Sequence, residues 1–259
     1  MLALLKRIVA HRELLLILVS RNLKIRYKSS VLGFFWTLLS PVFMICIYWT
    51  FLFILRFQID LPVLVTGIIV WQYLAMCLGD ALHAILGNAN LVRKTSSPRI
   101  IFPLAMVCAN LVNLLLSFVV LLVFLLLRGA EIGNLAWLPL IVATQFALCL
   151  GMSLLLSCSN VFFRDTEHVL STVLLAWFFL TPIIYPLNIL FQHVQNQIVR
   201  KMAFLNPMTG LVTAYRTVFL STSIIAPRLV TMSCMVAWFV LFLGIAVFQR
   251  NQMRFADEL

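Results

Sequence analysis

Charged side chains that could take part in chemistry are scarce in this sequence of 259 residues, which holds 8 acidic residues against 19 basic ones. They gather at three places. A basic run includes Arg21, Lys24 and Arg26, and a later stretch sets Asp80 three residues before His83. The third group comprises Arg164, Asp165, Glu167 and His168. Residues of these types serve in proton transfer, in metal binding or in contacts with a partner.

Catalysis by the chain itself is not indicated by its motifs. No Gly-Lys dipeptide occurs, so no Walker A loop is present to hold ATP phosphates. H-E-x-x-H and G-x-S-x-G are also missing, and Asp165 and Glu167 lie side by side in sequence rather than opposed across a cleft. The six cysteines are scattered singly without C-x-x-C spacing, as small buried hydrophobes are. We expect no catalytic residue, metal or cofactor here, and energy supplied by a partner.

The polar residues within apolar stretches are expected to join helices. Asp80 and His83 fall on one helical face, and an ion pair at the surface or between helices suits them better than a proton relay. Asn110 and Asn113 share one face of the uncharged stretch from Arg99 to Arg128. We expect their side-chain amides to form hydrogen bonds with a neighbouring helix.

Composition defines the elements that must position these residues. Hydrophobic residues make up 63% of the chain and charged residues 10%, and the mean hydropathy is +1.08. In soluble domains about half of the residues are apolar and about a quarter are charged, so this composition is typical of a membrane protein. Crossing about 30 Å of hydrocarbon takes about 20 apolar residues. Five uncharged stretches suffice: Lys28 to Arg56, Asp60 to Asp80, Arg99 to Arg128, Glu131 to Arg164 and Arg228 to Arg250. A shorter sixth span is expected from Val169 to Tyr185, where Pro182 and Pro186 end it.

The distribution of basic residues predicts the orientation in the membrane. With six spans both termini share one side, and that side carries thirteen of the nineteen Lys and Arg residues. The opposite side carries the other six: Arg56, Arg128, Arg200, Lys201, Arg216 and Arg228. Cytoplasmic segments hold such an excess, so both termini are expected in the cytoplasm. The group of Arg164, Asp165 and Glu167 would then form a charged cluster at the cytoplasmic face. The net charge of +11 is thus explained by topology and gives no reason to expect nucleic acid.

An amphipathic helix is predicted between Glu13 and Lys28, ahead of the first span and within an N-terminal segment of residues 1–30. Arg21, Lys24 and Lys28 recur at helical spacing on one face, and Leu15 and Val19 lie on another. Such a helix lies in the cytoplasmic interface and attracts anionic headgroups by about 1 kcal/mol per basic residue. It could serve only as an anchor, or also dock a cytoplasmic partner. The residues assigned to it are Arg21, Lys24, Arg26, Tyr27 and Lys28. Arg26 lies off the basic stripe, which indicates a second contact.

Two connecting segments are longer than a turn requires. After the second span, residues 81 to 94 read as helical with a basic tip at Arg93 and Lys94, which suggests either a contact or an ordinary interfacial loop. Outside, Pro186 to Pro227 is too apolar for a solvated loop and too interrupted for two spans. Non-helical backbone at membrane depth persists only beside protein or a water-filled cavity, so two short helices dipping into the membrane indicate a conduit.

A conduit through the membrane requires more than one copy of this chain. Six helices fill their own interior, whereas two copies about a two-fold axis can leave a channel between them. Aromatic rings offer flat apolar faces with polar edges in Tyr and Trp, although they also gather at membrane interfaces. The candidates for the substrate path are Tyr48, Trp49, Trp71, Tyr73, Trp177, Phe178, Phe179 and Tyr185.

Four stretches, in this order, resemble the permease subunit of ABC-2 transporters that export lipid-linked polysaccharides, the O-antigen and teichoic-acid exporters. They are RNLKIRYKSSVLGFFWTLLSP, NANLVRKTSSPRIIFPLA, FFRDTEHVL with FFLTPIIYP, and LNPMTGLVTAYR, within residues 12 to 250. One departure lies in KTSSPRIIFP, where Ser97 and Ile100 replace the aromatic and acidic residues of many relatives.

The resemblance implies an all-α polytopic membrane protein with six transmembrane helices. It has an N-terminal interfacial helix, a transmembrane domain over 31–250, two re-entrant exterior gate helices at about 187–222, and a cytoplasmic tail at 251–259. A coupling helix at about 84–95 would contact a separate ATPase that binds ATP and Mg. Its residues are Asn88, Asn90, Leu91, Val92, Arg93 and Lys94.

Several functions remain open at this point. The leading one is a homodimeric permease of the bacterial inner membrane that, with two copies of an ATPase, exports a lipid-linked, O-antigen-like polysaccharide. The alternatives are an ABC-2 permease for teichoic acid, capsule, a drug or a simpler lipid, an intramembrane enzyme acting on glycolipids, and a membrane scaffold. Turnover without an ATPase would favour the enzyme.

Overall fold

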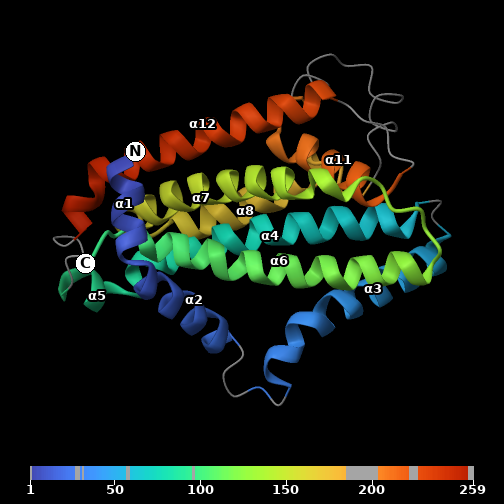
Figure 1. The fold of residues 1–259 in the computed structure, drawn as a ribbon, viewed down its shortest axis with the longest axis horizontal. Helices are drawn as coiled ribbons and strands as arrows, with labels where there is room; N and C mark the ends of the chain where they lie inside the picture. The colour runs from blue at the N-terminus through green and yellow to red at the C-terminus, as the bar shows by residue number, and fades with distance from the viewer. Residues whose placement is uncertain are drawn as a thin grey trace.

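The computed structural model describes residues 2–26, 30, 32–56, 59–94, 97–184, 204–221 and 227–255. Within these ranges the chain is all-α, with ten α-helices, and most of the long ones run along one axis (Figure 1). The helices are α1 (Leu2–Ala10), α2 (Arg12–Arg26), α3 (Trp36–Leu55), α4 (Leu61–Leu86), α5 (Ala89–Lys94), α6 (Ile101–Leu127), α7 (Leu138–Phe162), α8 (Thr166–Leu180), α11 (Pro207–Phe219) and α12 (Pro227–Asn251).

Five of these helices are long and apolar enough to cross a membrane: α3, α4, α6, α7 and α12. The chain is therefore a multi-pass membrane protein, and five of the six expected spans appear as long helices. The sixth is α8, an apolar helix of 15 residues that ends at Leu180. At 1.5 Å per residue α8 is about 22 Å long, shorter than the hydrocarbon core. Tyr185, the expected end of this span, lies outside the described residues.

Two expected boundaries differ in the structure. The second span was expected to end at Asp80, but α4 continues to Leu86. The expected single helix over residues 81 to 94 is interrupted, because α4 ends at Leu86 and a turn at Gly87 and Asn88 precedes α5. In the N-terminal segment α2 covers most of the helix predicted between Glu13 and Lys28, and a turn at His11 separates it from the additional helix α1.

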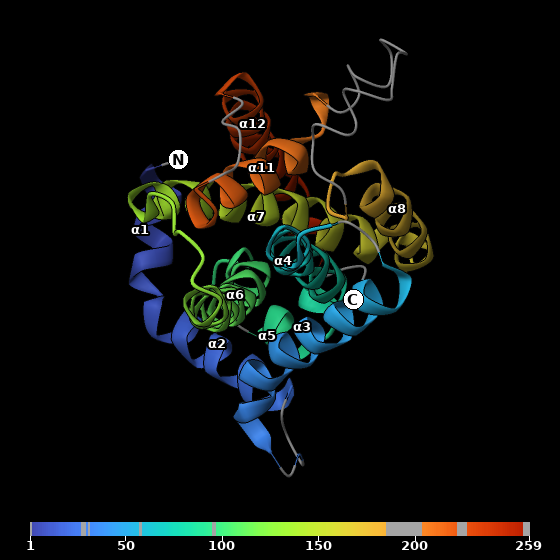
Figure 2. The same cartoon turned by 90° about the vertical axis from the view of Figure 1, so that its right-hand side faces the viewer.

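The bundle is arranged around α4. Viewed along the helices, α4 lies between α6 and α7, with α3 and α8 on its remaining side (Figure 2). Most of its side chains are buried, including Val65, Leu74 and Leu78. The N-terminus, the C-terminal residues and α5 gather at one end of the bundle, which we call the terminal end (Figure 1). The opposite end, where α3 ends and α4 begins, is called the far end.

Small residues allow α7 and α12 to pack backbone to backbone. A Cβ added at Gly244 would lie within 2.4 Å of the Gly151 carbonyl oxygen, and one at Gly151 would lie within 2.6 Å of the Leu241 nitrogen. Close approach at small residues is a common way to join helices in membranes, where no hydrophobic force drives association. These glycines therefore hold α12 against the bundle.

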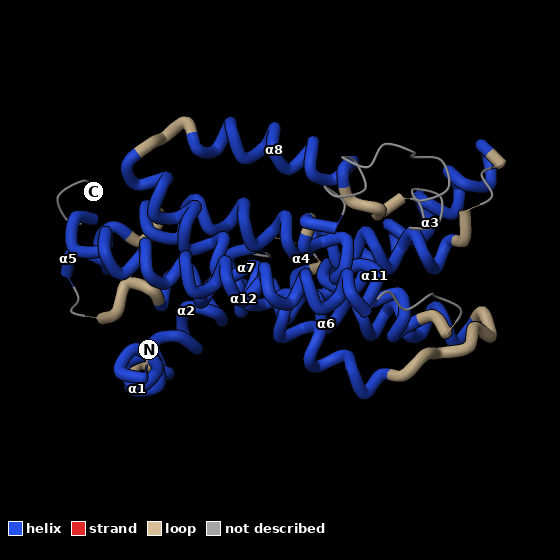
Figure 3. Tube along the Cα trace, turned by 90° about the horizontal axis from the view of Figure 1, so that it is seen from above, coloured by secondary structure: helices blue, strands red, loops and turns tan. Residues whose placement is uncertain are grey.

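Two helices that flank α4 are poorly covered by the rest of the chain, as is α12, of whose apolar stretch 22% is buried. Only 22% of the apolar window of α3 is buried, and Phe43, Ile47 and Phe53 on it are exposed. α8 lies along one side of the molecule as an outlying helix (Figure 3), and most of its side chains are exposed. α3 and α8 therefore expose large apolar surfaces beside α4.

Candidate functional site

The predicted coupling segment forms the short helix α5 at the terminal end. It begins after Asn88, whose carbonyl accepts from the backbone N–H groups of Leu91 and Val92. The Asn88 side chain is 5% exposed and donates to the Ala84 carbonyl at 2.8 Å, which ties α5 to α4. Val92 is also buried, whereas Asn90 and Arg93 are exposed. One side of α5 is therefore anchored in the protein while the other presents polar residues.

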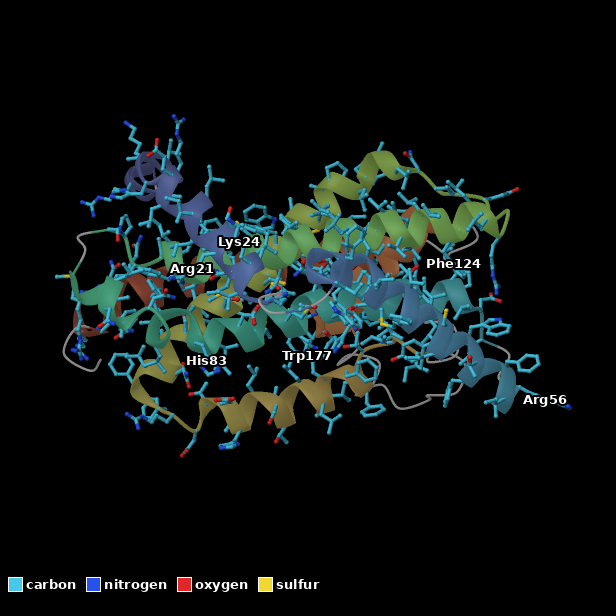
Figure 4. The ribbon with its side chains drawn as sticks, turned by 90° about the horizontal axis from the view of Figure 1, so that it is seen from below. Arg21, Lys24, Arg56, His83, Phe124 and Trp177 are labelled. Atoms are coloured by element: carbon cyan, nitrogen blue, oxygen red, sulfur yellow. The ribbon has the colours of Figure 1, made fainter. Side chains whose placement is uncertain are left out.

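The basic helix α2 contacts this segment directly. Arg21 donates from Nη2 to Oδ1 of Asn88 at 2.5 Å, so a residue of the predicted interface helix holds the residue that starts α5. Lys24, on the same helix, is exposed (Figure 4). Tyr27 and Lys28 lie outside the described residues. The side chain of Lys94 is likewise not described.

A second contact joins α2 to the bundle one turn further along. Arg26 donates to the Asp80 carboxylate at 2.5 Å and to the Asn110 side-chain oxygen at 2.8 Å. Asn110 in turn donates to Asp80 at 2.7 Å, which closes a triangle between α2, α4 and α6. We call Arg21–Asn88 and Arg26–Asp80–Asn110 together the α2 clamp. Asp80 thus forms the interhelical ion pair expected of it, and Arg26, off the basic stripe, makes a separate contact.

Asn113 differs from Asn110. Its amide is buried, but it has no hydrogen-bonding partner among the residues that the structure describes. The expected interhelical hydrogen bond is therefore confirmed for Asn110 only.

The charged cluster after α7 lies at the surface of the terminal end. Arg164, Asp165 and Glu167 are all exposed. Glu167 approaches His83 of α4 at 3.9 Å, and both side chains are well exposed. A loose pair of this kind contributes little to stability. Among the described residues no group of three His, Cys, Asp or Glu side chains could hold a metal ion.

An aromatic cluster joins α8 to α4. The Trp71 ring meets Trp177 edge to face, with ring centroids 5.7 Å apart, and meets Phe178 at 5.6 Å. Figure 4 shows Trp177 and His83 between these two helices. Such pairs contribute about 0.5–1.5 kcal/mol beyond area burial, so they position α8 despite its few other contacts.

The exposed residues of α4 form one stripe beside this cluster. Gln72, His83 and Leu86 are exposed and recur, with the half-buried Met76 and Gly79 between them, at steps of three or four, while most other residues of α4 are buried. Gln72 contacts the Met44 sulfur of α3 at 3.3 Å and His83 faces Glu167 beside α8, so the stripe runs between these helices. We call this surface the α3–α4–α8 face.

The other aromatic candidates lie in different environments. Trp49 and Phe179 are exposed, and Tyr48 is half-buried on α3. Tyr73 is 2% exposed and turned into the bundle, away from any surface of this chain. Tyr185 lies outside the described residues.

Residues of α11 form a polar junction that the sequence analysis missed. Arg216 is 4% exposed and donates to the carbonyls of Pro182 at 2.8 Å, Ile183 at 2.6 Å and Val63 at 3.1 Å. Burial lowers the pKa of Arg216 to about 10, so its guanidinium stays charged at neutral pH. Gly67 of α4 permits this approach, because a Cβ there would lie 3.0 Å from both Arg216 Nη2 and the Ile183 oxygen.

The first turn of α11 is held to α8 by a second set of bonds. The side-chain oxygen of Asn206 caps α11 by accepting from the Met208 N–H and also accepts from the Trp177 indole at 2.8 Å. Its amide donates to the Thr181 hydroxyl at 2.9 Å. A signal for this junction exists in the sequence, since Asn206 and Arg216 are polar residues of an apolar segment.

Comparison with known proteins identifies the family. Residues 13–220 match the ABC-2 type transporter family. The chain is 30% identical over 265 aligned residues to the O-antigen export system permease protein RfbA of Myxococcus xanthus, with 100% of each chain covered. It is 29% identical over 257 residues to a protein of the same name from Klebsiella pneumoniae, with 95% of each covered. ABC-2 permeases work with a separate ABC ATPase, and this chain belongs to the ABC-2 type transporter family as a transport subunit without an ATPase domain.

Proposed function

We propose that this chain is the permease of an exporter that moves a lipid-linked, O-antigen-like polysaccharide out across the bacterial inner membrane. The observation that carries the proposal is the similarity along the whole chain to permeases named for O-antigen export. Two copies of the chain would form the pathway, and two copies of a cytoplasmic ATPase, which bind ATP and Mg, would drive it.

The terminal end is proposed to face the cytoplasm. Thirteen of the nineteen Lys and Arg residues belong to segments assigned to that side, and cytoplasmic segments hold such an excess. An ATPase in the cytoplasm would then meet α5 and the exposed Arg164, Asp165 and Glu167. The far end, with Arg56 and Arg128, would face outward.

The geometry of α5 supports a coupling role. A helix that receives force must expose a contact surface and be attached firmly behind it. α5 exposes Asn90 and Arg93, and behind them the α2 clamp and the buried Asn88 attach it to α2 and α4. The interface helix α2 would therefore serve both as a membrane anchor and as a support for the docked ATPase.

The α3–α4–α8 face is the surface that we assign to the second copy. It combines exposed apolar side chains of α3 and α8 with Gln72 and His83, which are polar and would be costly in contact with lipid. If this face met the same face of a second copy across a two-fold axis, the stripe would line a hydrated channel that tolerates sugar hydroxyls. Trp71, Trp177 and Phe178 would support the wall, and Phe179 would lie on it.

The segment after α8 is proposed as the exterior gate. α11 supplies one short helix at the far end, packed through Arg216 and Asn206 onto the end of α8. The other gate helix, expected from Leu187, falls outside the described residues.

Charge reversal on α5 tests the coupling role. In cells that depend on this permease, the Arg93→Glu, Lys94→Glu variant should insert and assemble normally but lose most surface polysaccharide, because the exposed side of α5 would repel its partner surface. Purified with the ATPase, it should no longer show hydrolysis linked to export. Arg56→Glu, at the far end, is the matched control and should export normally.

The same experiment tests the substrate. Extraction of the surface glycan, followed by sugar analysis, should show a lipid-linked polysaccharide that disappears with the gene. Normal export by the α5 variant would contradict the coupling role. Loss of a teichoic acid, a capsule, a drug or a simpler lipid instead would keep the transporter and change its substrate.

A further inference from the structure

The far end of the bundle contains a cavity of about 530 Å³ formed by the ends of α3, α6 and α11 and the start of α4. Its volume lies within the range of about 300–1,000 Å³ found for small-ligand sites. The residues that bear on its chemistry are Trp49, Phe53, Asp60, Arg128, Glu131 and Ser221. We call this cavity the far-end cup.

One wall of the far-end cup is aromatic. The rings of Trp49 and Phe53 stack with centroids 5.7 Å apart and planes inclined by 19°, and Trp49 is 50% exposed. Leu52 and Leu61, which also line the cup, are buried. A flat exposed indole above an apolar floor suits a ligand with one apolar face.

The rim of the far-end cup carries both acceptors and donors. Asp60 holds the N-cap position of α4, yet its side chain does not cap the helix, and no described side chain donates to it. The Arg128 guanidinium lies 5.3 Å from the centre of the Phe124 ring, which holds it at the rim. Glu131 accepts from the Ser221 hydroxyl at 3.1 Å. The rim therefore offers carboxylate acceptors and a guanidinium donor.

The Glu131 side of the rim is held firmly in place. The Ser221 N–H also bonds to the Glu131 carbonyl, which ties this loop to the end of α11. Gly133 lies against α11 so closely that an added Cβ would come within 2.4 Å of the Thr217 carbonyl oxygen. A rim fixed in this way loses little conformational freedom when it binds a ligand.

The aromatic wall and the charged rim together exclude other classes of ligand. An anion such as phosphate would face two carboxylates against one guanidinium. A metal ion would find no group of three ligating side chains among the described residues. A hydrocarbon chain would bury the Asp60 and Glu131 carboxylates at high cost. A neutral polyhydroxyl ligand fits, because each hydroxyl both donates and accepts and a pyranose ring presents C–H groups to an aromatic face.

We infer that the far-end cup is a sugar-binding subsite that receives one or two sugar units of the polysaccharide as it leaves the membrane. This inference rests on the proposed export function and adds a place where the glycan is held. Trp49 would stack on the ring, while Asp60 and Glu131 would accept from its hydroxyls and Arg128 would donate. A subsite at the outer end of the spans would reduce backward slipping of the glycan between cycles of ATP hydrolysis.

The test uses the permease–ATPase complex in lipid nanodiscs. The probe is the glycan released by mild acid from the surface polysaccharide whose export the wild-type gene restores in a deletion strain. Binding is measured by saturation-transfer NMR. Trp49→Leu should weaken binding by about three- to tenfold, the range expected for loss of one aromatic stacking contact. Trp36→Leu, on the same helix at its other end, is the matched control and should bind as the wild type does.

A second variant tests the rim independently of the aromatic wall. Asp60→Asn with Glu131→Gln keeps the shape and removes two charged acceptors, and it should also weaken binding by at least threefold. Glu13→Gln, at an exposed acid in the first turn of α2, is its control. Inorganic phosphate at millimolar concentration should not compete with the glycan. Competition would overturn the sugar assignment in favour of an anion site.

The outcomes separate the subsite from the function on which it rests. Wild-type export together with equal glycan binding by both cup variants, or with no binding by the wild type, overturns the subsite and leaves the exporter standing. Absence of any polysaccharide restored by the wild-type gene refutes the proposed function, and the subsite with it. Should Trp49→Leu fail to assemble with the ATPase, the rim variant decides the question.

Discussion

The α2 clamp predicts a measurable coupling between Arg26 and Asp80. The perturbation is a cycle of Arg26→Met, Asp80→Asn and the double variant. Arg26→Met leaves the Asp80 carboxylate with Asn110 alone, and Asp80→Asn leaves the guanidinium facing a neutral amide. The double variant removes both charges, so neither group is left unpaired. We therefore expect the double variant to be about as stable as either single one.

The magnitude follows from how far the pair is buried. The Arg26 and Asp80 side chains are 26% and 33% exposed, which lies between a surface pair and a fully buried pair. Deleting one partner costs about 0.2–1 kcal/mol for exposed pairs and about 3–5 kcal/mol for buried ones. We expect about 1.5–2 kcal/mol for each single variant. In a chain of this size that corresponds to a fall of roughly 3–8 °C in the unfolding midpoint.

The assay is thermal unfolding of the purified permease in a mild detergent, followed by export from cells. Lys24→Met, a substitution of an exposed basic residue on the same helix, is the control and should change stability by less than about 0.5 kcal/mol. The single variants should also reduce export, since α2 supports α5. Additive effects within about 0.5 kcal/mol would refute the clamp.

Two further substitutions test the packing at the far end and between α7 and α12. Arg216→Met should lower the free energy of unfolding by about 2–4 kcal/mol, because three backbone carbonyls lose their hydrogen-bond donor. Arg216→Lys should lower it less. Thermal unfolding of Arg216→Met at the wild-type midpoint would contradict the junction. Gly244→Ala should lower the free energy of unfolding by about 1–3 kcal/mol, because the added methyl would meet the Gly151 carbonyl. The control is Gly79→Ala, whose methyl meets nothing within 4 Å and which should lower it by less than about 0.5 kcal/mol.

The long helices could be predicted because lipid imposes a simple length rule. Uncharged runs of about 20 residues must form helices that satisfy their own backbone in hydrocarbon. The rule misplaced the end of α4, because it treats any charge as the end of a span. Asp80 does not end the helix, since Arg26 and Asn110 neutralise and solvate its carboxylate within the protein. A charge whose partner lies 54 residues away gives no local signal of that partner.

The candidate site was only partly predictable. The sequence indicated α5, because it lies in a connection longer than a turn requires and has a basic tip. It also indicated a separate contact for Arg26, because this residue lies off the basic stripe of α2. Arg216 was counted with the exterior basic residues, although its partners are backbone carbonyls up to 153 residues away. Every residue has a backbone carbonyl, so the sequence contains no complementary side chain that would indicate the partners of Arg216. Tyr73 was a candidate by residue type, and only packing reveals that it faces the interior.

α4 connects the two ends of the bundle through one continuous helix. At its last turns it holds α2 through Asp80 and leads through Asn88 into α5. At its first turn the Val63 carbonyl accepts from Arg216 of α11, and neighbouring residues line the far-end cup. Its 26 residues span about 39 Å, more than the hydrocarbon thickness. A displacement of α5 would enter α4 through the short turn at Gly87 and Asn88, which the Asn88 side chain ties to Ala84, and would then reach α11 as movement of one helix. Force applied by an ATPase at α5 would act on the far end by this route.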